Sequence, residues 1–181
     1  FKTLEEHDDA LVKGINDTVG EDDILFCLGD WAFGRIAKES TCYKTEFRNR
    51  INCKTIHFVM GNHDEGIVKN TDYVRDIFTS VSNYLEVTFM EPYTGTEQGI
   101  RAKKQKVCMM HYPIRSWNYM RHGAYHLHGH CHNNLPDLVV KGEVQRTMDV
   151  GFDAHPEFRP FSYAEIKEIM DKRKVFTEDH H

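Results

Sequence analysis

The sequence has 181 residues, an ordinary globular composition and a net charge of −5 with histidine counted as neutral, which suits one domain and argues against a general nucleic-acid-binding surface. No apolar run is long enough to cross a membrane and no signal peptide is recognisable, so we expect no membrane partner. The five cysteines are odd in number and lack CxxC spacing, which disfavours a disulfide framework and favours a reducing cytoplasm.

The first predicted element is a helix. Apolar residues recur at helical spacing across residues 3–19, and Thr3 with Glu6 three places later predicts a capping box at its start. The apolar run "DILFCLGD" at 23–30 then predicts a buried strand that stops at a loop. Residues 40–52 predict a second helix with a basic outer face.

The remaining elements are mostly strands, and Ser162 with Glu165 predicts a capping box for the last helix. In chain order they are a strand at 54–64, a short helix at 73–81, two paired strands at 84–95 and 100–113, strands at 125–132 and 143–153, and a terminal helix at 162–174. The sequence has no repeat, low-complexity tract or linker, so we expect residues 1–181 to form a single domain.

Four of the predicted strands share one feature: an apolar run is followed by glycine or a turn and then by a polar side chain. The pattern occurs in "LGDW", "MGNHD", "MMHYP" and "HGHCH". Ligands and substrates collect where strand ends meet at one rim of a sheet, because the sheet is rigid and the loops carry the chemistry. We therefore expect these polar residues to converge: Asp30, Asn62, His63, His111, His130 and His132.

A carboxylate, an amide oxygen and several imidazoles form a mixed oxygen and nitrogen ligand set. Such a set suits Mn, Fe, Zn, Co or Ni. A carboxylate can bridge two ions, and two ions roughly 3.5–4 Å apart can bind both oxygens of an in-line displacement at phosphorus. A histidine is the usual proton donor to a leaving alkoxide near neutral pH. The pattern therefore favours metal-dependent hydrolysis of a phosphate ester.

In this order, "GDWAFG", "GNHD", the lone histidine of "MHYP" and "GHCH" resemble four motifs of the calcineurin-like metallophosphoesterase superfamily. The stretches "HYPIRSWN", "HGAYHLHGHCH" and "VGFDAHPEFRPFSYAEI" resemble its small bacterial and phage-type members, so the likeness covers nearly the whole chain. The resemblance implies an α/β (α+β) fold of two packed mixed β-sheets flanked by helices. These would form a four-layer α/β/β/α sandwich with the metals at one edge.

The resemblance also implies a dinuclear centre that holds two divalent transition-metal ions (Mn, Fe, Zn, Ni or Co) and a metal-activated water or hydroxide nucleophile. His63 would protonate the leaving group or stabilise the transition state, and Asp64 would orient His63 through a hydrogen bond. The implied metal ligands are Asp30, shared by both ions; Asn62, His111 and His130 at the second ion; and His132 at the first.

The substrate implied by the resemblance is a phosphomonoester or a phosphodiester, so nucleic acid is expected only as a substrate. Arg115 and His122 follow the strand that ends at His111. A fixed cation or donor in that position can contact the substrate phosphate. The alternative for both residues is an exposed loop without a functional role.

The chain departs from the family pattern at its start. The family's first motif, Asp-x-His, ends the opening strand and supplies two ligands to the first ion, but no such motif lies near Phe1. We interpret the domain as lacking its first strand, a gap of about 15–25 residues at typical element lengths. We therefore expect the chain to hold the second ion better than the first.

Two other functions remain open. One is a non-catalytic metal-binding or scaffold protein that has the fold and lacks the first motif. The other is a different dinuclear hydrolase of the metallo-β-lactamase kind, which typically shows HxHxDH after a strand. "HLHGHCH" lacks the closing Asp-His pair, so this hypothesis ranks third.

The stretch "YHLHGHCH" is expected to divide at Gly129. His126 and His128 belong to the strand body, where packing or hydrogen bonding in support of a ligand is favoured. His130 and His132 follow the glycine, where the chain can leave strand geometry. Cys131 is expected to point away from the metals, because alternate strand residues face opposite ways.

Overall fold

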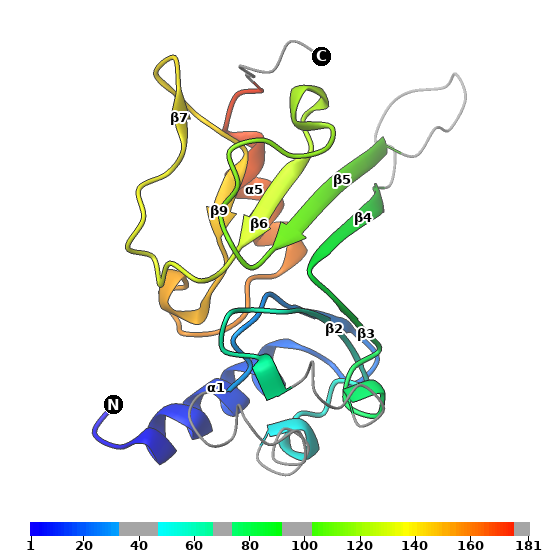
Figure 1. Cartoon of the computed structure of the whole chain (residues 1–181), viewed down its shortest axis with the longest axis vertical. Helices are drawn as coiled ribbons and strands as arrows, with labels where there is room; N and C mark the ends of the chain where they lie inside the picture. Colours follow the sequence, from blue (N-terminus) through cyan, green and yellow to red (C-terminus); the bar gives the residue numbers. More distant parts are fainter. Residues whose placement is uncertain (33–46, 67–73, 92–102, 176–181) are drawn as a thin grey trace.

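The computed structural model describes residues 1–32, 47–66, 74–91 and 103–175, which form a mixed α/β fold with several sheets (Figure 1). Helix α1 (Leu4–Thr18) lies near the start of the chain and helix α5 (Tyr163–Asp171) near its end. The strands are β1 (Ile24–Cys27), β2 (Thr55–Val59), β3 (Ser80–Ser82), β4 (Tyr84–Glu91), β5 (Lys103–Met110), β6 (Tyr125–His128), β7 (Val139–Val140), β8 (Glu143–Val144) and β9 (Thr147–Asp149). Short 3₁₀ helices are η3 (Arg48–Arg50), η4 (Met120–His122) and η5 (Phe152–Ala154).

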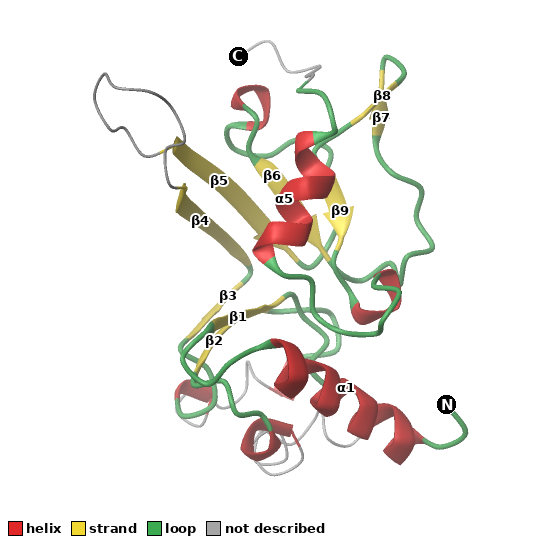
Figure 2. Ribbon diagram, turned by 180° about the vertical axis from the view of Figure 1, so that it is seen from behind, coloured by secondary structure: helices red, strands yellow, loops and turns green. Residues whose placement is uncertain are grey.

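Three parallel strands form the first sheet, in the order β1–β2–β3. Helix α1 lies on one side of this sheet (Figure 2). Among the described strands, β1 pairs with β2 alone. The other edge of β1 therefore presents backbone N–H and C=O groups that no described strand takes up.

Four strands form the second sheet, in the order β4–β5–β6–β9. Strands β4 and β5 are antiparallel from Tyr84 opposite Met110 to Glu91 opposite Lys103, which confirms the predicted pairing of these two segments. The turn predicted between them lies outside the described residues. Strands β6 and β9 continue the sheet in parallel to β5, and β7 with β8 forms a separate two-stranded ribbon.

The buried side chains of the first sheet belong to two hydrophobic clusters. Leu25, Ile56 and Phe58 pack with Ile15 of α1 in one cluster. The alternate residue Val59 belongs to the other cluster, which also contains buried residues of β5, β6 and α5. Successive residues of a strand point to opposite faces, so this one sheet is packed on both sides. The expected mixed α/β class with more than one sheet is confirmed.

Both predicted helix starts are present, but the two caps differ. Thr3 accepts the backbone N–H of Glu6, and the Glu6 carboxylate accepts the N–H of Lys2 rather than that of Thr3. The predicted capping box at α1 is therefore only half formed. At α5 the box is complete, because Ser162 and Glu165 each accept the other's backbone N–H.

Two predicted elements differ from the structure. Ser80 and Val81, expected at the end of a short helix, belong to β3 along β2, because pairing with an open strand edge outweighs local propensity. The single strand expected at 143–153 is two short strands, β8 and β9, interrupted at Gln145 and Arg146. Most of the helix predicted at 40–52 lies outside the described residues, and its described end is the 3₁₀ turn η3.

The four cysteines within the described residues are free, as the odd count and the spacing predict. No helix in the described part of the chain is long and apolar enough to cross a membrane.

The capping box of α5 predicts a specific pH dependence. Arg159 and the backbone N–H of Ser162 hold the pKa of Glu165 well below its usual range. A lowered carboxyl pKa stabilises the fold above the unfolded value of about 4.3 and loses that effect as the pH falls. We expect Glu165→Gln to lower the free energy of unfolding by about 1 kcal/mol at pH 7, given its partial exposure, and by clearly less at pH 3. Urea unfolding at both pH values measures this, with the exposed Glu168→Gln as control; equal losses at both pH values would contradict it.

Candidate metal centre

Four loops bring polar side chains to one place. Strands β1 and β2 are parallel, so the loops that follow them leave the same edge of the first sheet. Strands β5 and β6 are parallel in the second sheet, and the chain after them carries His111 and His130. These two histidines meet Asp30 and Asn62, so four of the six side chains expected to converge are brought together.

His111 stands at the centre of this group. Its Nε2 atom lies 3.0 Å from Oδ1 of Asn62, 3.1 Å from Nδ1 of His130 and 3.4 Å from Oδ2 of Asp30. The His111 side chain is buried, whereas Asn62 and His130 are exposed. The group is therefore anchored in the protein on one side and open to solvent on the other.

The proton on His111 has a defined place. Its Nδ1 atom lies 2.7 Å from the carbonyl oxygen of Leu28, which can only accept, so Nδ1 carries the hydrogen. In the neutral ring Nε2 then presents a lone pair to the oxygens of Asn62 and Asp30, which present lone pairs as well. A single proton added to Nε2 could form a hydrogen bond to one of these oxygens. A metal cation can accept the lone pairs of all these atoms at once. A histidine ligand usually donates its other ring N–H to a group such as a backbone carbonyl, as His111 does here.

The spacing of these atoms matches a coordination shell. Bonds of about 2.1 Å from a metal to nitrogen or oxygen place neighbouring ligand atoms about 3.0 Å apart in an octahedron and about 3.4 Å apart in a tetrahedron. The three measured distances run from 3.0 to 3.4 Å. Ligand atoms of Asp30, His111 and His130, one from each, also lie within 4.8 Å of one another, so these three residues with Asn62 could hold one divalent transition-metal ion.

Asp64 links the loop that follows β1 to the loop that follows β2. Its carboxylate accepts the backbone N–H groups of Asp30, Trp31 and Gly61 at 2.7–3.0 Å, and the side chain is 1% exposed. Burial raises the pKa of this carboxyl, while the three N–H groups act in the opposite direction. The predicted task of orienting His63 stays a prediction. The structure gives Asp64 the task of fixing the backbone that carries Asp30.

Asp30 is presented to the group in a defined orientation. Its Oδ1 atom accepts the backbone N–H of His63 at 3.0 Å, which leaves Oδ2 facing His111. The backbone at Asp30 is left-handed, with φ of 55°, and the preceding Gly29 has φ of 99°. A side chain at Gly29 would meet Nδ1 of His111 at 2.4 Å, so glycine is required for the ring to reach the Leu28 carbonyl.

His132 is not brought into this group. Its Nδ1 atom lies 2.6 Å from Oδ2 of Asp153, and its side chain is 60% exposed. The carboxylate accepts the Nδ1 hydrogen, so Nε2 keeps a lone pair, which is the arrangement of a histidine ligand supported by a carboxylate. The first-ion role of His132 stays a prediction, and Asp153 becomes its supporting residue.

The other predicted site residues, His63, Arg115 and His122, lie in three different segments of the chain. His63 follows Asn62 directly, and its side chain is exposed at the same loop. Arg115 is exposed in the segment between β5 and β6. His122 lies just before β6 begins, whereas His130 lies just after β6 ends. His122 and His130 thus lie at opposite ends of β6 along the chain.

His126 is a structural residue, as expected for the strand body. It is fully buried, with Nδ1 donating to the carbonyl of Cys108 and Nε2 accepting the N–H of Ile114, both at 3.2 Å. Burial lowers its pKa to about 4, so the ring is neutral near pH 7. This histidine ties β6 to β5 and to the segment that follows β5.

Two residues at the centre had not been singled out from the sequence. Tyr112 packs its ring edge-on against both His111 and His130, with centroids 4.8 Å away in each case. Asp153 supports His132, as described above. Asp153 does follow a strand and a glycine, the same pattern that marked the other ligands, whereas nothing local signals the position of the Tyr112 ring.

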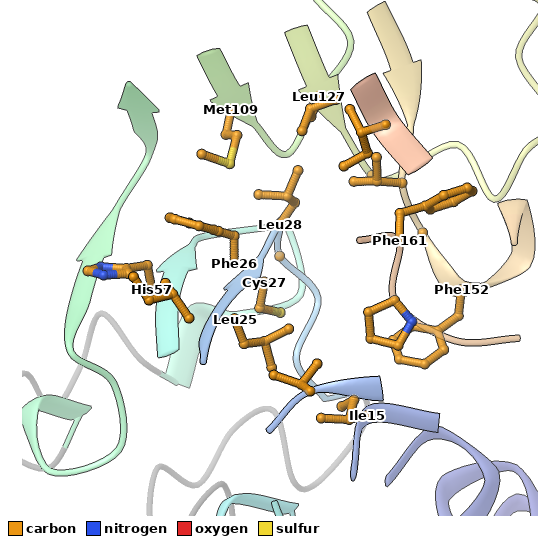
Figure 3. Close-up of a pocket in the computed structure, with 18 of the residues that line it drawn as sticks. Ile15, Leu25, Phe26, Cys27, Leu28, His57, Met109, Leu127, Phe152 and Phe161 are labelled. Carbon is orange, nitrogen blue, oxygen red and sulfur yellow. The ribbon is translucent and has the colours of Figure 1, made fainter. Parts of the chain in front are cut away.

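A large apolar cavity adjoins the group. It has a volume of about 1090 Å³ and reaches Asp30, His111, His130 and His132 at one end. Figure 3 shows Ile15 and Leu25 on one side of it and Met109 and Leu127 on the opposite side. All four residues of β1 line the cavity, and so do the residues that follow it as far as Asp30, so the cavity extends from β1 to the candidate ligands.

Comparison of this chain with models of protein families, with curated proteins and with solved structures gives no match.

The loops that follow β1 and β2 approach each other closely at Gly61, which predicts the effect of a substitution there. A side chain at Gly61 would meet Oδ1 of Asp30 at 2.3 Å and the Asp30 nitrogen at 2.6 Å. We expect Gly61→Ala to push Asp30 out of position, to abolish Mn²⁺ binding and to destabilise the fold by about 1–3 kcal/mol. Calorimetric Mn²⁺ titration and thermal unfolding measure both effects.

Gly20→Ala is the matched control, because its new methyl group meets only the Asp23 side chain. Undiminished Mn²⁺ affinity in Gly61→Ala would show that Asp30 is not a ligand in the position described.

Proposed function

We propose that this chain is a metal-dependent phosphoesterase of the calcineurin-like metallophosphoesterase type, acting on a phosphomonoester or a phosphodiester. The observation that carries the proposal is the crowding of potential ligand atoms around Nε2 of His111, at distances of 3.0–3.4 Å. These residues come from the four motifs that suggested the family, and they come together from both sheets. Their oxygen and nitrogen atoms suit Mn, Fe, Zn, Ni or Co.

Each residue has a stated part in this proposal. Asp30, Asn62, His111 and His130 hold one divalent ion. When bound, the ion stabilises negative charge on phosphoryl oxygens and lowers the pKa of the attacking water. His63 lies beside the ligands and donates a proton to the leaving oxygen, the role that histidine commonly takes near neutral pH. Arg115 is the candidate cation for the remaining phosphate oxygens.

The open edge of β1 and the cavity beside it support a further part of the proposal, the missing first strand. An extended segment carrying the Asp-x-His motif fits alongside β1, where it would pair with the backbone and complete the four-layer α/β/β/α sandwich. Its ligands would join Asp30 and His132 to hold the other ion. Without such a segment, the described residues favour binding of a single Mn²⁺ ion.

Metal content tests the ligand assignment. We expect the chain to bind one Mn²⁺ ion, and we expect His111→Ala to lose it, because His111 contacts every other member of the group. Plasma mass spectrometry after Mn²⁺ loading and desalting gives the ratio of metal to protein. His57→Ala is the control, since His57 bonds Ser80 and stacks on Phe26 away from the ligands. Two Mn²⁺ ions per chain at full occupancy would show that the assignment is incomplete.

Turnover tests the reaction. With Mn²⁺ present we expect hydrolysis of p-nitrophenyl phosphate or bis-p-nitrophenyl phosphate, and we expect His63→Ala to lower kcat by about 10²–10⁴-fold. Mn²⁺ binding should be unchanged in this variant, because the His63 side chain is not among the ligands. His7→Gln, on α1, is the matched histidine control. Full activity in His63→Ala would remove the proton-donor role.

A non-catalytic metal-binding or scaffold protein is the second candidate, and one observation favours it: His132 stands apart from the group and bonds Asp153. It predicts Mn²⁺ binding that depends on His111 with no turnover of either ester. The free thiols of the described cysteines support a reducing compartment under either function.

A further inference from the structure

A second cluster of potential ligands lies on the other side of the "HGHC" turn. One ring nitrogen of His128, the thiol sulfur of Cys131 and a carboxylate oxygen of Asp149 all lie within 4.8 Å of one another. His128 ends β6, Asp149 ends β9, and the two residues are register partners in the parallel pair. Cys131 reaches them from the turn that follows β6. Three separate parts of the chain thus bring different ligand types together.

The three side chains are oriented so that ligand atoms remain available. Nδ1 of His128 lies 3.0 Å from the Gly129 carbonyl, which can only accept, so in the neutral ring Nε2 has the free lone pair. Each Asp149 oxygen accepts one backbone N–H, from Gly151 and from Asn133. A carboxylate oxygen has two acceptor positions, so Asp149 can bind a cation while it keeps both bonds. These backbone bonds are the outer support that metal ligands typically have.

The cluster is chemically different from the group around His111. That group offers nitrogen and oxygen alone, whereas this one adds a thiolate, which favours Zn²⁺ and similar borderline ions over Mn²⁺. A thiolate and a carboxylate together neutralise a divalent cation, which limits the cost of holding it beside the largely buried His128. The Cys131 sulfur lies with His128 and Asp149, whereas Nδ1 of His130 lies beside His111.

We propose that His128, Cys131 and Asp149 bind an ion of the Zn²⁺ class, separate from the one held by Asp30, Asn62, His111 and His130. The site has three protein ligands and a fourth position open to solvent. The thiol proton passes to solvent as the thiolate binds. The ion joins the ends of β6 and β9 to the turn that carries His130 and His132.

Binding requires a small closure of the three side chains. Bonds of about 2.0–2.1 Å to nitrogen or oxygen and about 2.3 Å to sulfur place tetrahedral ligand atoms roughly 3.4–3.6 Å apart. The three atoms therefore approach by about 1 Å from separations of up to 4.8 Å. Rotation of the Cys131 side chain, which lies in a turn and is partly exposed, can supply much of this movement.

Cobalt substitution tests the site directly. Co²⁺ bound by a thiolate gives a near-ultraviolet charge-transfer band, and a site made of nitrogen and oxygen gives none. We expect the full chain loaded with Co²⁺ to show this band, Cys131→Ser to lose it, and Cys27→Ser, which removes another partly exposed thiol, to retain it. Circular dichroism confirms that each variant is folded. Absence of the band in the unsubstituted chain, or its persistence in Cys131→Ser, would overturn the proposal.

Two further measurements separate this site from the proposed enzyme. His111→Ala should lose Mn²⁺ and keep the cobalt–thiolate band, so failure of the phosphoesterase proposal leaves the second site standing. In the unsubstituted chain, Zn²⁺ should protect Cys131 from alkylation, as read by peptide mass mapping, whether or not Cys131→Ser folds. Equal alkylation of Cys131 with and without Zn²⁺ would count against the site.

Discussion

The candidate ligand geometry depends on the Asp64 carboxylate. It accepts three backbone N–H groups, two from the loop after β1 and one from the loop after β2. Each of these groups left without its acceptor in a buried place would cost about 1–3 kcal/mol. The same bonds hold the left-handed backbone at Asp30, so that one oxygen meets the His63 N–H and the other faces His111. A buried structural contact thereby fixes a candidate ligand that is itself partly exposed.

The turn after β6 has a strained backbone that hydrogen bonds to neighbouring segments hold in place. His130, His132 and Asn133 all have left-handed backbones, with φ of 67°, 47° and 57°, a conformation that costs of order 1 kcal/mol or more for each such residue. Asp149 accepts the Asn133 N–H, and Asp153 accepts from His132, so β9 and the segment after it hold the strained turn in place. Because of this geometry, His130 faces the His111 group while Cys131 faces Asp149. Neighbouring residues of one turn can therefore serve different ions.

The sequence predicts some parts of this centre well and others poorly, for physical reasons. Asp30, Asn62, His111 and His130 could be predicted because each follows an apolar strand, and parallel strands bring their ends to one edge. The position of His132 depends on three left-handed residues in its turn, which no local pattern encodes. Strand β3 was predicted as helix because its strand geometry comes from pairing with β2. The substrate-binding role of Arg115 or His122 stays a prediction; along the chain, His122 precedes β6 and His130 follows it.

The cavity connects the packing of the protein to its chemistry. Protein interiors are close-packed, and voids much larger than a water molecule are few. The space of about 1090 Å³ lined by Ile15, Leu25, Met109 and Leu127 is partly open to solvent, so it exposes apolar side chains to water, which is unfavourable. The cavity is lined by the residues of β1, one edge of which has no partner among the described strands, and it is lined by His132 as well. The proposed first strand would suit these features, since an extended segment with alternating apolar residues would place side chains in the space and would pair its backbone with β1. A small apolar ligand would cover the apolar side chains but would not pair with the edge of β1, so the proposed strand accounts for both features and a ligand for one.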